Sequence, residues 1–245
     1  MEQYSRKDFI RMAGLSAATV CGLSALSCAG VKRKDLSDAF SQAAPSLDPD
    51  IRSILELAVL SPSGHNTQPW TVRILSPRRI IIGSDRSRWL PAVDPQNREC
   101  MLSIGAFIET LVTASRICGY EAEVKVTGAS AFDSEIAEIR LSKGIISKEN
   151  PSLIRSRRTV RKGYLPDELS SADFRQITGG DSRFTIVPPS SANGRRLAEA
   201  TIDANIVQVE RTAAQAELSR WIRFSDADVK RYRNGLTVEG MEIQG

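Results

Sequence analysis

Histidine is almost absent from this chain of 245 residues, in which His65 is the single example. Metal sites rich in histidine are therefore excluded, and most His-based catalytic triads have little basis here. The four cysteines form no Cys-x-x-Cys pair and show no metal-like spacing, so no metal site is expected. The 33 Lys and Arg residues are scattered among 29 acidic residues, without an extended basic stripe interleaved with aromatic residues. A nucleic-acid partner is therefore not expected.

The first thirty residues have the pattern of an export signal. Arg6 and Lys7 precede an uncharged run over residues 12–30 that is rich in Ala, Gly, Ser and Leu. A positive region followed by a modest apolar region is typical of a signal peptide. Residues 5–11 resemble a twin-arginine signal, with Lys7 where the second Arg is usual, and an ordinary secretory leader is the alternative. The chain is therefore expected in the periplasm or cell envelope.

The end of this leader and the segment after it leave two questions open. Ala25-Leu26-Ser27-Cys28 loosely matches a lipoprotein box, so a lipid anchor on Cys28 is one alternative and simple cleavage is the other. Residues 31–48 are expected to form a polar tether. The two cysteines of the body, Cys100 and Cys118, could form a disulfide or remain buried free thiols.

The first half of the body, residues 49–145, predicts a helix, two strands, a second helix and two more strands. Asp48 and Pro49 have the pattern of a helix start, and a second helix is expected to end at Gly119. Alternating apolar residues predict the strands. They lie around positions 70–74, 79–83, 122–126 and 135–141. Adjacent strand pairs with helices between them predict an α+β fold.

The second half, residues 150–245, carries weaker signals. Ser170 and Asp173 predict a capping box for a short helix. A short strand is expected over 184–187 and a long helix over 195–216. No element is expected after Gly235.

The loop from Pro62 to Trp70 concentrates chemistry. It holds hydroxyls, the single imidazole and two carboxamides between a helix end and a strand. Such groups both donate and accept hydrogen bonds, which suits a polyol or the edge of a heterocycle. A polar turn with no ligand is the alternative.

A second candidate segment, residues 155–162, carries five cations and two hydroxyls. Guanidinium groups match phosphate oxygens in a bidentate way, so a terminal phosphate is a natural ligand. The alternative is a solvated basic face.

Together these two stretches resemble the nitroreductase family. Pro-Ser-x-x-Asn-x-Gln-Pro-Trp, at positions 62–70, resembles the FMN-contacting loop of that family. Residues 157–162 resemble its Arg-Arg-Ser-x-Arg segment, and 165–169 resemble the sequel to that segment. The loop precedes the Arg segment here, which is the reverse of ordinary nitroreductases and is similar to the Acg branch. Residues 94–99 and 221–235 also look Acg-like.

The resemblance implies a nitroreductase-like three-layer fold built from two half-domains in one chain. It implies FMN as cofactor and places eight residues near it: Ser63, His65, Asn66, Gln68, Arg157, Arg158, Thr159 and Arg161. The three Arg residues would lie near the phosphate, with Thr159 in place of the usual Ser. His65 is also compatible with a packed loop histidine, and Arg73 and Arg88 are expected at the surface. Because Acg-like chains usually continue beyond this length, the second half is expected to be incomplete.

The leader and the resemblance together imply an exported, FMN-dependent oxidoreductase. It would take electrons from a small-molecule donor and reduce nitro compounds or quinones. The flavin would carry the redox chemistry, so no catalytic side chain is required. Two alternatives are a flavin-binding or flavin-sequestering protein with little turnover, and a non-catalytic envelope lipoprotein. A homodimer is a further arrangement that the family resemblance allows.

Overall fold

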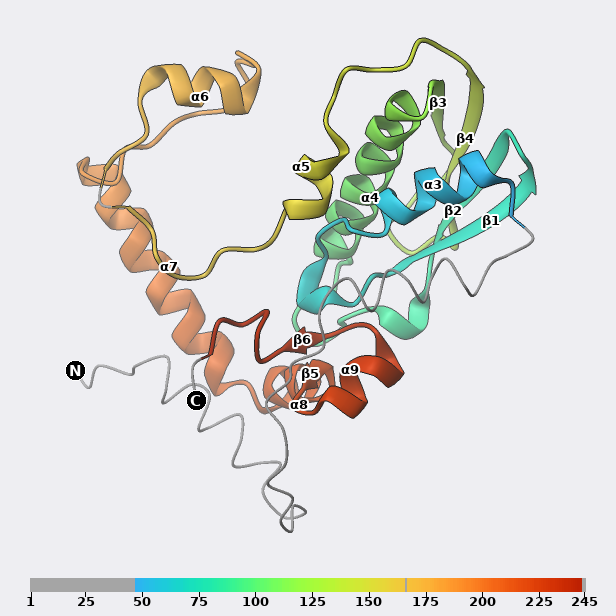
Figure 1. The fold of residues 1–245 in the computed structure, drawn as a ribbon. Helices are drawn as coiled ribbons and strands as arrows, with labels where there is room; N and C mark the ends of the chain where they lie inside the picture. The colour runs from blue at the N-terminus through green and yellow to red at the C-terminus, as the bar shows by residue number, and fades with distance from the viewer. Residues whose placement is uncertain (1–46, 166, 244–245) are drawn as a thin grey trace.

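The computed structural model of the chain describes residues 47–165 and 167–243 (Figure 1). The expected leader with Cys28, and residues 31–46 of the expected tether, lie outside these residues. Three parts can be named. The sheet unit comprises residues 47–143, the arm comprises residues 162–210, and the C-terminal module comprises residues 211–243.

The sheet unit begins with helix α3 (Pro49–Ala58), which starts at the cap that the sequence predicts. The Asp48 side chain accepts hydrogen bonds from the backbone N–H groups of Asp50 and Ile51, and Pro49 occupies the first turn. The second helix, α4 (Arg98–Ile117), is twenty residues long. It is apolar enough to resemble a membrane span by composition. Its buried side chains nevertheless form the centre of the core.

Four antiparallel strands form the sheet in the order β1-β2-β4-β3. They are β1 (Trp70–Ser76), β2 (Arg79–Ser84), β3 (Tyr120–Val126) and β4 (Glu135–Lys143). The predicted order of helix, two strands, helix and two strands is confirmed, and so is the α+β class. Figure 1 shows α3 and α4 lying across the sheet.

The core lies between this sheet and the two helices. Phe107 of α4 is fully buried, and its ring stacks on that of Trp70 with centroids 4.7 Å apart. The other residues of the core include the aliphatic side chains Ile51, Ile54, Ile80, Ile82, Ile104, Leu111 and Ile139. The opposite face of the sheet carries ion pairs instead, in which Arg79 and Arg140 both contact Glu138. The sheet unit therefore has one dry face and one charged face.

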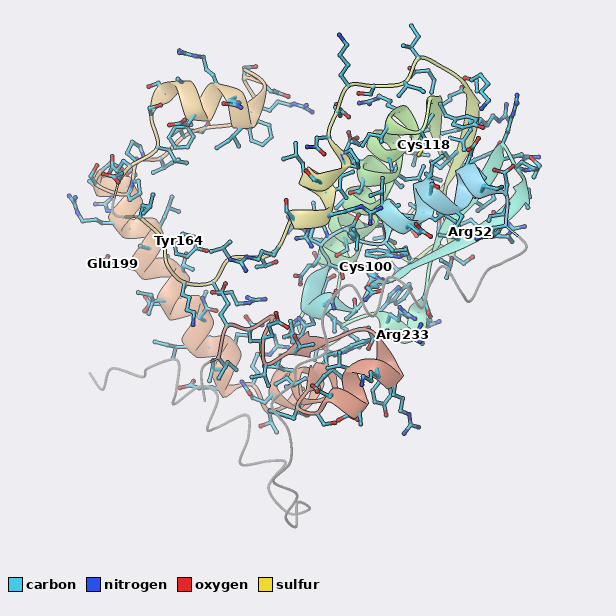
Figure 2. All side chains as sticks on the ribbon, viewed as in Figure 1. Arg52, Cys100, Cys118, Tyr164, Glu199 and Arg233 are labelled. Atoms are coloured by element: carbon cyan, nitrogen blue, oxygen red, sulfur yellow. The ribbon has the colours of Figure 1, made fainter. Side chains whose placement is uncertain are left out.

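The positions of Cys100 and Cys118 exclude a disulfide between them. Cys100 lies in the first turn of α4, and Cys118 caps its other end (Figure 2). A helix of that length separates them by roughly 27 Å, far beyond the reach of a disulfide. Both are free thiols, and burial raises the pKa of each.

After α5 (Pro151–Ser156), which packs on α3 and α4, the chain leaves the sheet unit as the arm. The arm contains α6 (Ser171–Thr178) and α7 (Ala192–Glu210), and it projects away from the sheet (Figure 1). The predicted capping box of Ser170 and Asp173 is present. No described residue from 162 to 210 is buried. Tyr164 and Glu199, labelled in Figure 2, both lie on this arm.

Three predictions for this half are wrong. Residues 184–187 form no strand, because no described strand lies beside them to complete a ladder. The long helix breaks at Arg211, whose extended backbone ends α7 and starts α8 (Thr212–Trp221), while its guanidinium donates to the Ala92 carbonyl.

A short element does follow Gly235. Strand β6 (Leu236–Thr237) pairs in parallel with β5 (Ile222–Arg223), and α9 (Asp226–Tyr232) joins the two.

Candidate functional site

The loop between α3 and β1 is held in an uncommon conformation. His65, Asn66 and Gln68 all have positive φ angles, of 49°, 52° and 53°. Residues other than glycine rarely adopt this left-handed region, although His and Asn are enriched there, and such residues cluster at functional sites. The short 3-10 turn η1 (Gly64–Asn66) forms the middle of the loop.

Two hydrogen bonds fix the loop, one within the loop itself and one to helix α4. The Ser63 hydroxyl accepts from the Gln68 backbone N–H at 3.0 Å, and the Gly64 N–H donates to the Ser103 hydroxyl at 3.2 Å. A side chain at position 64 would collide with Glu99, since a Cβ there would lie 2.7 Å from the carboxyl carbon. A larger residue at this point of the loop would therefore require the Glu99 side chain to move.

Arg88 holds the same loop from the side. Its guanidinium donates to the backbone carbonyls of Thr67 and Gln68, at 3.3 and 3.1 Å. Arg88, which is expected at the surface, is half-buried there and bonded to the loop. Arg73 is exposed, as expected, and pairs with Glu135 on the charged face of the sheet.

His65 is half-buried, and burial is the main cause that lowers its pKa below the ordinary value. The nearby carboxylates of Glu99 and Glu217 act in the opposite direction, and the Arg161 guanidinium adds to the lowering. The imidazole is therefore largely neutral at neutral pH.

Two of the predicted cofactor ligands bind the C-terminal module. The Asn66 Nδ2 donates to the Gly235 carbonyl at 2.9 Å, and the Gly235 N–H donates back to the Asn66 carbonyl at 2.9 Å. The Gln68 Nε2 donates to the Arg233 carbonyl at 2.8 Å. Arg233 is labelled in Figure 2 at the edge of this module. Each carboxamide still has a carbonyl oxygen and a second N–H beyond these bonds.

The Arg-rich segment divides into residues that face the loop and residues that face solvent. The Arg157 Nε donates to the Leu60 carbonyl, just before the loop, at 3.2 Å. The Arg161 Nε donates to the Gly240 carbonyl at 3.1 Å, and its backbone N–H donates to the Glu242 carboxylate at 3.0 Å. Arg158 and Thr159 are exposed. Within residues 47–165 and 167–243, neither makes a side-chain hydrogen bond or ion pair.

The structure thus gathers Ser63, His65, Asn66 and Gln68 in one loop and brings Arg157 and Arg161 up to it. Arg158 and Thr159 lie on the same segment with free polar groups. This donor set fits FMN chemically, with carboxamides and hydroxyls for the ring edge and ribityl chain and guanidiniums for the phosphate. The cavity beneath the loop, lined in part by Trp89, Asp94 and Cys100, is only large enough for about one water molecule, so a flavin would lie outside it.

Sequence reasoning missed two buried charged residues near the loop. Glu217 of α8 is 2% exposed, and its carboxylate accepts from the backbone N–H groups of Ala92 and Val93. Arg223 of β5 is 8% exposed and bonds backbone carbonyls of its own module. For Glu217, the one sequence signal of burial is that this acid lies among the small residues of α8. The sequence around Arg223 offered no comparable signal.

Curated relatives of the chain are named as nitroreductases. "Putative NAD(P)H nitroreductase Rv3131" of Mycobacterium tuberculosis is 32% identical over 117 residues, which make up 46% of this chain and 34% of that protein. "Probable NAD(P)H nitroreductase PigM" of Serratia is 27% identical over 150 residues, 58% of this chain and 40% of that protein. "Putative NAD(P)H nitroreductase acg" of Mycobacterium tuberculosis is 35% identical over 75 residues. No protein-family model matches the chain.

A solved nitroreductase-like protein from Streptococcus mutans aligns with 65% of this chain and 96% of its own length, at 16% identity and a TM-score of 0.31. A score this low does not establish a shared overall fold. The α+β class is instead established directly by the elements of the sheet unit.

The chain is thus similar in sequence to proteins named as nitroreductases, as the two motifs predict, and acg is among them. The matches with Rv3131 and PigM span only 34% and 40% of the length of those proteins.

Proposed function

We propose that this chain is an exported, FMN-dependent oxidoreductase of the nitroreductase type. It takes two electrons from a small-molecule donor and delivers them to a nitro compound or a quinone. The names of the relatives support the oxidoreductase class, and the family supports a flavin.

One observation carries the proposal: two motifs from distant parts of the sequence meet at one place. Arg157 donates to the carbonyl of Leu60, just before the loop, and Arg161 donates to Gly240 of the C-terminal module, which also binds the loop at Asn66. A basic face with no ligand would not need to approach a loop of carboxamides and hydroxyls. A ligand with a polar heterocycle at one end and a phosphate at the other would require this arrangement.

The residues of the chain would hold and orient the cofactor. Asn66 and Gln68 would offer their remaining carboxamide groups to the ring edge, and Ser63 would support the loop through the Gln68 N–H. Arg158 and Thr159 would bind the phosphate together with Arg157 and Arg161. When bound, FMN would supply the two-electron chemistry by accepting a hydride equivalent from the donor and passing it to the acceptor.

A second candidate, a flavin-holding protein with little turnover, is favoured by a separate observation. The segment Arg233–Gly235 lies on the loop and uses one N–H of each carboxamide. A segment in this position would restrict the approach of a donor or acceptor. Steady-state oxidation of a donor with nitrofurazone or menadione separates the two candidates, because only the enzyme turns over repeatedly.

The proposed export is tested by cell fractionation. A tagged full-length chain should appear in the envelope fraction, and a chain starting at Val31 should remain in the cytoplasm. Equal cytoplasmic location of both would remove this part of the proposal.

FMN binding is tested by titrating the purified chain, without residues 1–30, with FMN and following flavin fluorescence and visible absorbance. Arg158→Ala should weaken binding about tenfold, since a charge-assisted hydrogen bond to phosphate contributes on that scale. Because Arg158 has no partner in the described structure, its loss should not disturb folding.

The matched control is Arg183→Ala, which removes an equal charge from an exposed ion pair on the arm. It should leave FMN affinity unchanged. A folded wild-type chain that stays colourless with saturating FMN would overturn the flavin assignment.

A further inference from the structure

Arg223 is a buried cation for which no described residue provides an acidic partner. Its guanidinium donates to the backbone carbonyls of Asn234 and Arg220, at 3.1 and 2.6 Å, and to the Asn234 Oδ1 at 2.8 Å. The rings of Tyr232 and Trp221 flank it, with centroids 4.6 and 5.7 Å from the guanidinium carbon. Burial of a charge is costly unless dipoles satisfy it, so these bonds specify where the backbone must lie.

The segment that Arg223 fixes, Arg233–Gly235, is tightly constrained. Arg233 has a φ of 53° and Gly235 a φ of 85°. A Cβ at position 235 would lie 2.4 Å from the Trp221 carbonyl oxygen and 2.9 Å from the Arg223 Nε. Gly235 can therefore pass between Arg223 and the rest of the module only because it has no side chain.

The same segment makes three hydrogen bonds to the candidate cofactor loop. Two of them form the reciprocal pair between Asn66 and Gly235, and the third joins the Gln68 carboxamide to the Arg233 carbonyl. A chain of contacts thus runs from Arg223 through its own turn to both carboxamides of the loop. If the turn moves, the orientation of both carboxamides changes with it.

Glu217 provides a second anchor between the same two parts. Its carboxylate accepts three contacts of 3.1–3.2 Å from the backbone N–H groups of Ala92 and Val93, and α8 also packs on η1. The C-terminal module is therefore attached to the sheet unit both at the loop and at Ala92 and Val93. These contacts fix the position of the Arg233–Gly235 turn relative to the sheet unit.

We propose that Arg223 is a positioning residue of the proposed cofactor site, which acts by fixing the Arg233–Gly235 turn that orients the Asn66 and Gln68 carboxamides. The inference rests on the proposed function for its reference to FMN. The geometric part, control of the loop by a residue of the C-terminal module, can be tested without any flavin.

The experiment compares Arg223→Met with Asn234→Asp in the chain without residues 1–30. Hydrogen exchange of the Gly235 amide, which donates to the Asn66 carbonyl, should accelerate about tenfold or more in Arg223→Met, because opening of the turn then becomes easier. The Gln68 amide, which donates to the Ser63 hydroxyl within the loop, should also exchange faster, because the loop loses the contacts that the turn makes with it. The amides of Ile80 and Ile139 in the sheet should exchange as in the wild type. Asn234→Asp keeps an oxygen acceptor for Arg223 and should keep wild-type protection at all four amides.

FMN affinity is the second readout. Arg223→Met should weaken it about tenfold, whereas Asn234→Asp should not. The sheet variant Ile139→Val controls for a general loss of stability, and it should lower the unfolding temperature without changing FMN affinity.

The outcomes separate the two proposals. Unchanged exchange at Gly235 and Gln68 overturns the positioning role of Arg223, and so does faster exchange with unchanged FMN affinity. If the wild type binds no FMN, the proposed function fails, and the exchange data alone decide whether Arg223 controls the loop. Loss of protection throughout the sheet in Arg223→Met would mean that Arg223 supports the whole fold, which also overturns the specific role.

Discussion

Helices α4 and α7 have nearly the same length, 20 and 19 residues, yet they form for different reasons. Most of the large apolar residues of α4, among them Ile104, Phe107 and Leu111, lie in the core beside the sheet, and Leu102 is exposed. In α7, the side chains of Leu197, Ile202, Ile206 and Val207 are exposed, and no residue of the helix is buried. The Ser191 side chain caps α7 by accepting from the Gly194 N–H, and backbone hydrogen bonds within the helix complete it. The comparison teaches that apolar content alone does not create a core, since the residues must also share a face that another element covers.

This difference predicts where the stability of the chain resides. The sheet unit should contribute most of the free energy of unfolding, and the arm should contribute little. Substitutions of similar type in the two regions test this expectation.

The largest effect is expected from Phe107→Ala in the sheet unit. Phe107 is fully buried and stacked on Trp70, so its truncation should lower the free energy of unfolding by about 3–5 kcal/mol through lost transfer energy and a new cavity. Urea unfolding followed by circular dichroism measures the change. A loss below about 1 kcal/mol would show that this core is much looser than its packing indicates.

A smaller effect is expected from acid at the charged face of the sheet. Hydrogen bonds from Arg79 and Arg140 lower the pKa of Glu138 from its ordinary 4.5 to about 2. Because the folded-state pKa is depressed, this stabilisation is present above pH 4.5 and is lost as the pH falls toward 2.

Glu138→Gln isolates this contribution. The variant should unfold at a lower temperature than the wild type at pH 7, and the difference should narrow between pH 4.5 and 2. Thermal unfolding at a series of pH values measures it. A difference that stays constant down to pH 2 would contradict the assigned pKa shift.

The smallest effect is expected from Leu197→Ala on the arm. This side chain is 56% exposed, so its truncation should change the free energy of unfolding by less than about 0.5 kcal/mol. The measurement is the same urea unfolding as for Phe107→Ala. A loss of more than about 2 kcal/mol would show that α7 is packed in solution, and the contrast between the two helices would disappear.

The sequence predicts the sheet unit well because its signals are local and agree with one another. The Asp48 cap, the alternation of the strands and the single apolar face of α4 all lead to the same order of elements. The arm lacks such agreement. Phe184 and Ile186 suit a strand, but a strand forms only beside a partner, and sequence alone does not supply one. The break occurs at Arg211, whose guanidinium contacts Ala92, and a contact between residues so distant in the sequence leaves no local pattern.

The candidate site likewise has a part that the sequence predicts and a part that it does not. The motifs identify the loop residues and the Arg-rich segment, and their meeting in space follows from the resemblance. The bonds from Asn66 and Gln68 to the C-terminal module could not be predicted, because backbone carbonyls accept from any suitable donor and leave no mark in the sequence. The buried charges of Glu217 and Arg223 are hidden for the same reason, since their partners are peptide groups. The assignment of the eight site residues to FMN remains a prediction.

The reciprocal pair between Asn66 and Gly235 has a consequence for biosynthesis. Its partners are 169 residues apart, so the loop emerges from the ribosome long before the turn that holds it. At about 5–20 residues per second, translation takes on the order of ten seconds to cover that distance. A nascent chain would therefore expose the loop without its C-terminal contacts until the turn of Arg233–Gly235 has been synthesised.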